Sequence, residues 1–272
     1  MSKVSKDSLG DRMKTYEAVP KNYLTRRTPV IVRLDGKACH SFTRGLNKPF
    51  DDIFIQSMQQ TMKYLCEHIQ GCVVGYTQSD EITLVLCDYM KLDTSAWFDN
   101  QVQKIVSVSA SIATFAFNKW FKLLAERHIG LMSVYSVNDD NTLTDSAIKY
   151  KDILTKRIDQ GLMFDSRCFN VPKEEVCNCL IWRQQDATRN SIEGLAQSLF
   201  SHKELQGVNC KGLQDKMFTE KGVNWNDLPT QLKRGSCCVK VQNGKWFIDT
   251  DIPVFTQDRN YVENRIVFED AE

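Results

Sequence analysis

The sequence lacks the features that mark membrane, secreted and low-complexity proteins. No run approaches the about eighteen apolar residues that a membrane span requires, and the opening MSKVSKDSLGDRMK lacks the apolar core of a signal peptide. Only six prolines are present, and no repeat or linker divides the chain. We therefore expect one domain over residues 1–272, a cytoplasmic location and no membrane partner.

Disulfide bonds and a structural zinc site are not expected either. The ten cysteines are scattered among predicted helices and strands, without a CxxC pair. The closest spacings are Cys177 with Cys179 and the adjacent Cys237 and Cys238, and the four histidines lie far from both. The spacing of a tetrahedral zinc site is therefore missing, and reduced thiols are predicted.

The net charge of +1 excludes a strong overall electrostatic field as the means of attracting a nucleic acid. A local surplus exists near the C-terminus, where eight basic and four acidic residues lie between Phe200 and Lys245. A mixed charged run of this kind usually forms only a solvated face. If the protein binds RNA, the local positive charge of this segment favours it as the RNA-binding surface.

The hydrophobic pattern predicts an α+β fold with one antiparallel sheet. Strands are expected at about 29–34, 72–76, 82–86 and 162–171, with further short strands near 238–241 and 246–248. Helices are expected at about 50–69, 98–126 and 172–199, with an irregular polar segment through the 130s to 150s. The order β-α-β-β-α-β is the ferredoxin-like arrangement, with helices on one face of the sheet.

Acidic residues stand at the ends of two predicted strands. Asp35 follows the first strand, and Asp80 and Glu81 lie at the turn between the second and third. Strands one and three are neighbours in this topology, so carboxylates that are far apart in sequence would meet at one edge of the sheet. Crowded carboxylates repel one another unless a cation binds them, and oxygen ligands favour Mg²⁺.

Gly36 fits a metal-dependent site of this kind. Two metal ions about 3.5 to 4 Å apart stabilise the attacking and leaving oxygens of phosphoryl transfer. Without a Cβ atom, Gly36 lets the chain turn sharply, so that its carbonyl can face a metal and the following amides a triphosphate. Asp-Gly and Ser-Asp-Glu are each ordinary turn sequences, and only their combination at strand ends predicts the site.

Five segments together resemble the tRNA(His) guanylyltransferase superfamily, and within it the guanylyltransferase-like proteins found outside eukaryotic tRNA(His) maturation. The segments are VRLDGKACHSF, LNKPFD, GYTQSDEITLVL, FDSRCF and WRQQDATRNS, which follow the family's order over about 30–235. The resemblance implies a polymerase and cyclase palm over about 28–200. Helical and short-strand additions over about 201–272 would contact RNA or nucleotide.

The resemblance also implies a reaction and its partners. A 5′ end of tRNA would be activated with ATP or GTP, and the 3′-hydroxyl of an incoming nucleoside triphosphate would then attack the activated phosphate. This is 3′-to-5′ polymerisation, with two Mg²⁺ ions as cofactors. A homotetramer is implied as well.

The same resemblance implies roles for individual residues. The implied catalytic residues are Asp35, Asp80 and Glu81, and the implied metal ligands are Asp35, the Gly36 carbonyl and Asp80. The implied nucleotide-binding residues are Asp35, Gly36, Lys37, Ala38, Cys39, His40, Lys48, Ser79, Asp80, Lys104 and Asn190.

Two departures from the family pattern bear on the substrate. Residues 188–191 read TRNS where the eukaryotic tRNA(His) enzymes carry His-Ile-Asn-Asn. Residues 99–101 are Asp, Asn and Gln where the family pattern has a basic cluster before Lys104. The first departure favours templated repair of 5′-truncated tRNA over guanylation of tRNA(His). A nucleotide cyclase and a non-catalytic RNA-binding module stay open as alternatives, although the first strand offers no aromatic side chain for base stacking.

Structural roles also stay open for several of these residues. Lys48 and Asn190 could be ordinary surface residues, and His40 is expected to have a local role without acid–base chemistry. Trp182 and Arg183 could be core residues, with Arg183 paired to Asp186 at helical spacing.

Overall fold

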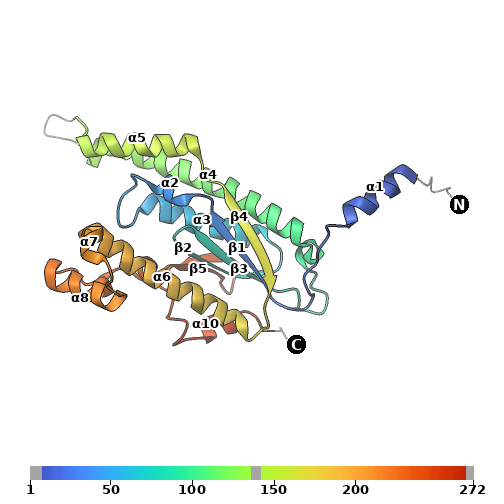
Figure 1. The fold of residues 1–272 in the computed structure, drawn as a ribbon. Coiled ribbons are helices and arrows are strands. Elements are labelled where there is room, and N and C mark those ends of the chain that lie inside the picture. Colours follow the sequence, from blue (N-terminus) through green and yellow to red (C-terminus); the bar gives the residue numbers. More distant parts are fainter. Residues whose placement is uncertain (1–7, 136–141, 268–272) are drawn as a thin grey trace.

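A computed structural model describes residues 8–135 and 142–267. Six antiparallel strands form one sheet in the order β4-β1-β3-β2-β5-β6 (Figure 1). The strands are β1 (Val30–Gly36), β2 (Cys72–Gln78), β3 (Glu81–Leu86), β4 (Phe164–Asn170), β5 (Ser236–Lys240) and β6 (Trp246–Asp249). All six lie within a few residues of their predicted positions, and β1 has β3 as a neighbour, as expected.

Helices α3 (Asp52–His68) and α4 (Val102–Tyr135) cover one face of the sheet. Side chains alternate along a strand, so Val32 and Leu34 of β1 enter the core beneath these helices. The start of α3 was predicted correctly: the Asp51 carboxylate accepts a hydrogen bond from the Phe54 amide at 2.9 Å and caps the helix.

The opposite face is covered by α6 (Glu175–Leu199), which follows the β-α-β-β-α-β unit (Figure 1). The two helices of that unit lie on one face as expected, but a sheet covered by helices on both faces was not predicted. Ile31, Val74 and Val85 point to this second face and pack with Val176 and Leu180 of α6. The physical reason is visible in β1 itself. Its first residues are apolar without alternation, as in a strand buried on both faces.

The prediction of an irregular 130s to 150s segment was also wrong where the structure describes it. Helix α4 continues to Tyr135, and α5 (Asp145–Gln160) packs along it (Figure 1). The Thr144 hydroxyl caps α5 by accepting from the Ala147 amide at 3.2 Å. Its inward apolar residues Ala147, Tyr150, Ile153, Leu154 and Ile158 recur at helical spacing, so an amphipathic pattern was present and the prediction overlooked it. Residues 136–141 lie outside the described part of the chain.

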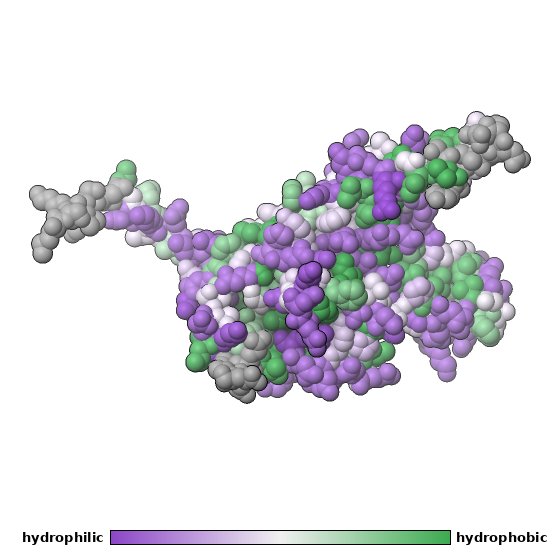
Figure 2. All heavy atoms as spheres, turned by 180° about the vertical axis from the view of Figure 1, so that it is seen from behind, coloured by the Kyte–Doolittle hydropathy of each residue, from purple (hydrophilic) through white to green (hydrophobic). Residues whose placement is uncertain are grey.

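Shorter elements complete the fold. They are α1 (Ser8–Ala18), α2 (Cys39–Thr43), α7 (His202–Leu205), α8 (Cys210–Lys221), α9 (Thr230–Arg234), α10 (Asn260–Glu263) and the 3₁₀ turns Trp97–Asn100 and Trp225–Asp227. Helix α1 projects from the body and buries none of its side chains (Figures 1 and 2). The C-terminal part packs α8 against α6, and β5 and β6 extend the sheet beyond β2.

All ten cysteines are free thiols, as predicted. Among the described helices, none combines the length and apolar character needed to cross a bilayer.

Candidate active site

The two acidic segments meet at the end of β1. In the antiparallel register Asp35 lies directly opposite Glu81, and the Gly36 amide donates a hydrogen bond to the Asp80 carbonyl at 3.1 Å. The strand end and the hairpin tip are therefore joined through the backbone. This is the meeting point that the topology predicted.

Gly36 is closely packed at this junction. A Cβ atom at this position would lie 3.3 Å from the Asp80 Cβ and 3.2 Å from the Leu162 side chain. Both distances are shorter than ordinary carbon contacts, so a Cβ atom here would require Asp80 or Leu162 to shift by a few tenths of an ångström. Glycine therefore allows Asp35 and Asp80 to stand side by side.

The two aspartates carry charge that the protein does not neutralise fully. Burial raises the pKa of Asp35, and the negative charges of Asp80, Glu81 and Asp165 raise it further. Burial also raises the pKa of Asp80, against hydrogen bonds from Ser79 and the buried Cys39 thiol that lower it. Both shifts disfavour the ionised carboxylates, so a bound cation would stabilise this corner.

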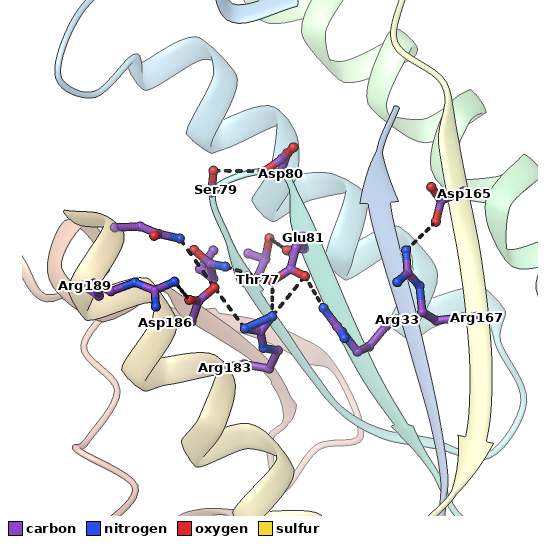
Figure 3. Close-up of polar contacts among 12 residues, drawn as sticks. Arg33, Thr77, Ser79, Asp80, Glu81, Asp165, Arg167, Arg183, Asp186 and Arg189 are labelled. Atoms are coloured by element: carbon purple, nitrogen blue, oxygen red, sulfur yellow. Dashed lines mark hydrogen bonds and ion pairs between the residues drawn. The ribbon is translucent and has the colours of Figure 1, made fainter. Parts of the chain in front are cut away.

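Glu81 is held differently from the two aspartates. Its carboxylate accepts hydrogen bonds from Arg33, from Arg183 at 2.9 and 3.2 Å, and from the Gln78 amide at 3.0 Å (Figure 3). All three charged side chains are largely shielded from solvent. Both carboxylate oxygens are thus occupied, and the geometry favours a positioning role for Glu81 over a role as ligand or base.

The predicted pair between Arg183 and Asp186 is present at 2.9 Å. It continues the ion-pair network from the sheet into α6, where Asp186 also binds Arg189 (Figure 3). Arg183 is buried, but Trp182 is about half exposed, so only Arg183 fits the core alternative. The network fixes the hairpin against α6.

Asp165 of β4 is a member of the cluster that the sequence analysis missed. It lies opposite Asp35 in the register of β1 with β4, and it pairs with Arg167 at 3.0 Å. The strand was predicted, but only its register could show which residue faces Asp35. Because Asp165 is exposed and paired, it is a weaker ligand candidate than Asp35 or Asp80.

The loop after Gly36 presents backbone amides beside the aspartates. The Lys37 amide donates to the Met163 carbonyl at 2.8 Å, so it is not available to a ligand. Within the described residues we find no acceptor for the amides of Ala38, Cys39 and His40. Ala38 has a left-handed backbone, with φ 54°, and it begins α2. These three amides are the ones that phosphate oxygens could reach.

A pocket of about 280 Å³ adjoins the hairpin tip. Lys48 from the turn before α3, Ser79 from the hairpin and Asn190 from α6 line its wall. Three predicted nucleotide-binding residues thus come together from segments far apart in sequence. The C-terminal part contributes Gln231 and Ser236, which share a hydrogen-bond network with Gln59.

Lys104 is not brought to this pocket. It lies in the first turn of α4, exposed, with its ammonium 5.7 Å from the centre of the Phe98 ring. The part of α4 that faces the site is about three turns further on, where the Thr114 hydroxyl accepts from the Phe164 amide at 3.1 Å. Any role of Lys104 in this reaction is outside this pocket.

Comparison with known proteins decides the family. The family model described as Thg1, tRNAHis guanylyltransferase, matches residues 10–172. The chain belongs to this family. The match includes β1, the hairpin and β4, which together carry the acidic cluster.

Solved structures in the tRNAHis guanylyltransferase family resemble this chain over nearly its full length. A bacterial tRNA(His) guanylyltransferase (Thg1)-like protein in complex with ATP is 42% identical, with a TM-score of 0.79, over 96% of this chain and 100% of that one. A bacterial Thg1-like protein in complex with GTP is 38% identical, with a TM-score of 0.75, over 95% of this chain and 99% of that one. An uncharacterized protein of Acanthamoeba polyphaga mimivirus is 28% identical over 98% of this chain and 91% of its own length.

Proposed function

We propose that this protein adds nucleotides to the 5′ end of tRNA in the 3′-to-5′ direction after activating that end with ATP or GTP. The observation that carries the proposal is the junction of Asp35 and Asp80 beside the pocket lined by Lys48, Ser79 and Asn190. Family membership and the ATP and GTP complexes of similar proteins support it. The cytoplasmic location stays a prediction from the sequence.

The proposed scaffold is a ferredoxin-like palm. The order β4-β1-β3-β2, with α3 and α4 on one face, agrees with that arrangement. In a palm of this kind the ends of β1 and the hairpin hold the reacting groups. The segment from α7 to β6 is proposed to contribute to nucleotide and RNA contact, and Gln231 and Ser236 in the pocket wall support that role.

The residues at the junction fit two Mg²⁺ ions as cofactors. No three His, Cys, Asp or Glu side chains in the described chain are grouped to hold a metal ion, and the proposed ligands are two carboxylates, of Asp35 and Asp80, with the Gly36 carbonyl. Mg²⁺ is commonly bound by one or two carboxylates together with substrate phosphates. When bound, the ions would stabilise the attacking and leaving oxygens of phosphoryl transfer.

The remaining residues act on the nucleotide. The amides of Ala38, Cys39 and His40 would donate to phosphate oxygens, which fixes the triphosphate beside Asp35. Lys48 would balance phosphate charge as a flexible cation. Asn190 would contact the nucleotide from α6 across the pocket. These contacts would hold the reacting phosphate in place, and positioning of this kind supplies much of the rate enhancement of an enzyme.

Replacing Lys48 by alanine should weaken ATP binding by about tenfold or more, because a hydrogen bond to a charged group contributes about 1.5 to 3 kcal/mol. The matched control is Lys104→Ala, which removes an exposed lysine that lies outside the pocket. Equilibrium titration of ATP into both variants measures the effect. Equal losses in the two variants would mean that the pocket is not the nucleotide site.

Templated repair of 5′-truncated tRNA is the proposed substrate choice. The absence of the His-Ile-Asn-Asn run in α6 supports repair over guanylation of tRNA(His). A homotetramer is proposed as the assembly. An apolar hollow on α3 and α4, lined by Tyr64, Val108, Ile112 and Phe115, supports contact between copies there, since apolar surface of this kind favours association.

Incubation with labelled 5′-truncated tRNA and all four nucleoside triphosphates tests the function. The labelled RNA should become longer at its 5′ end, and a full-length tRNA should serve as a control that is not extended by repair. Production of cyclic nucleotide in the absence of RNA would instead support the cyclase alternative. Binding of RNA without any extension would support the non-catalytic module.

A further inference from the structure

Trp182 is an exposed aromatic residue beside the acidic cluster that the proposed reaction does not use. About half of it, 51%, is accessible to solvent. Its ring nevertheless has a fixed support, because the Arg183 guanidinium lies 3.9 Å and the Arg33 guanidinium 5.0 Å from the ring centre. Both arginines also bind the Glu81 carboxylate, which anchors them beneath the indole while half of Trp182 stays open to solvent.

The surface next to Trp182 leads to Asp35. Arg33 and Asp35 share one face of β1, and Arg167 and Asp165 lie opposite them on β4. The side chains of Asp165 and Arg167 remain more than half exposed, so α6 does not cover this part of the sheet. We call this surface the open strip; it consists of Trp182, Arg167, Asp165 and Asp35.

The open strip and the nucleotide pocket are separate surfaces. Trp182 is not among the residues that line the pocket, whereas Asn190, two turns later on α6, is. A second molecule could therefore reach Asp35 along the strip while a nucleotide occupies the pocket. In the proposed reaction that second molecule is the RNA.

We propose that Trp182 is a stacking platform for a base of the RNA substrate next to its reacting 5′ end. An exposed indole held by a guanidinium is rigid, and any base can stack on it because every base has a π face. Arg167 of the open strip is already paired with Asp165, so the expected contact is with a base and not with a phosphate. This inference rests on the proposed function.

A structural alternative is that Trp182 only shields the arginine network from water. Trp182→Leu and Trp182→Phe separate the two roles, because leucine covers the arginines without stacking on a base and phenylalanine does both. Tyr16→Ala is the control, since Tyr16 is an exposed aromatic residue on α1, outside the pocket and the open strip. Each variant is titrated with a 5′-truncated tRNA at several salt concentrations and with ATP.

The platform predicts that Trp182→Leu weakens tRNA binding by about 5- to 150-fold, the range for one stacked base. The slope of affinity against salt should not change, because no phosphate contact is lost, and ATP affinity and melting temperature should stay at wild-type values. Trp182→Phe should retain most of the tRNA affinity, and Tyr16→Ala all of it.

Several results would overturn the inference. Unchanged tRNA binding by Trp182→Leu, or a reduced slope of its tRNA affinity against salt, would each contradict it. Loss of ATP affinity in this variant would assign the indole to a nucleoside triphosphate. A lowered melting temperature with equal losses of tRNA and ATP affinity would leave only the shielding role. Failure of the wild-type protein itself to bind tRNA would contradict the proposed function and the platform together.

Discussion

Replacing Asp35 by alanine should lower the rate of 5′ nucleotide addition by about three orders of magnitude or more. Asp35 is a proposed ligand of the Mg²⁺ ions, and metal ions supply several kcal/mol of transition-state stabilisation. Each 1.36 kcal/mol corresponds to a factor of about ten in rate. Single-turnover extension of 5′-truncated tRNA at saturating nucleotide measures this loss without a contribution from product release.

Asp165→Ala is the matched control for Asp35→Ala. It removes a carboxylate from the same face of the sheet, directly opposite Asp35, but one that is exposed and paired with Arg167. Extension by this variant should stay close to the wild-type rate. Similar large losses in both variants would contradict the assignment, because they would show that charge across the whole cluster matters and not the ligand at the end of β1.

The Asp35 variant should keep its fold. In the folded protein the pKa of Asp35 is raised by burial and by neighbouring carboxylates. Without a cation, the ionised carboxylate therefore lowers the stability of the fold once the pH rises above the pKa that Asp35 has in the unfolded chain. Alanine removes that cost. The metal-free variant should therefore melt at or above the wild-type temperature at neutral pH, which separates lost catalysis from lost structure.

Replacing Arg183 by methionine should lower the free energy of unfolding by about 3 kcal/mol or more. Arg183 is buried between Glu81 and Asp186 and binds both, and removal of one partner from a buried ion pair leaves uncompensated charge at a cost of about 3 to 5 kcal/mol. Urea unfolding measures the change. Arg259→Met is the control, because its pair with Glu263 is exposed and such pairs contribute about 0 to 1 kcal/mol.

The double variant Glu81→Gln with Arg183→Met tests the reason for this loss. If uncompensated charge on Glu81 causes it, neutralising Glu81 should recover part of the stability, and the two effects should not add. Additive losses would assign the cost to packing of the Arg183 side chain against Trp182. A loss below 1 kcal/mol in the single variant would mean that Arg33 alone is sufficient to hold Glu81.

Local patterns in the sequence were enough to predict much of the sheet and the start of α3. The strand β1 and the hairpin depend on neighbouring residues, and so does the pairing of Arg183 with Asp186. The meeting of Asp35 with Asp80 required one topological step, the adjacency of strands one and three. Each of these features follows from residue spacing.

The features that could not be predicted depend on long-range register and packing. Arg183 reaches Glu81 across 102 positions of sequence, and no local pattern specifies that contact. Asp165 faces Asp35 only because β4 pairs with β1 in one register. Helix α5 is a different case, because its inward apolar residues recur at helical spacing and the pattern was overlooked. The position of Lys104 outside the pocket depends on where α4 crosses the sheet.

The central claim is that Asp35 and Asp80 bind divalent cations beside a triphosphate. Crystals grown with Mn²⁺ and a non-hydrolysable nucleoside triphosphate test it most directly, because anomalous scattering locates the metal. The account predicts manganese between these two carboxylates and the Gly36 carbonyl, with the triphosphate on the amides that follow. A bound triphosphate with no manganese at the two aspartates, or with manganese only elsewhere, would contradict it.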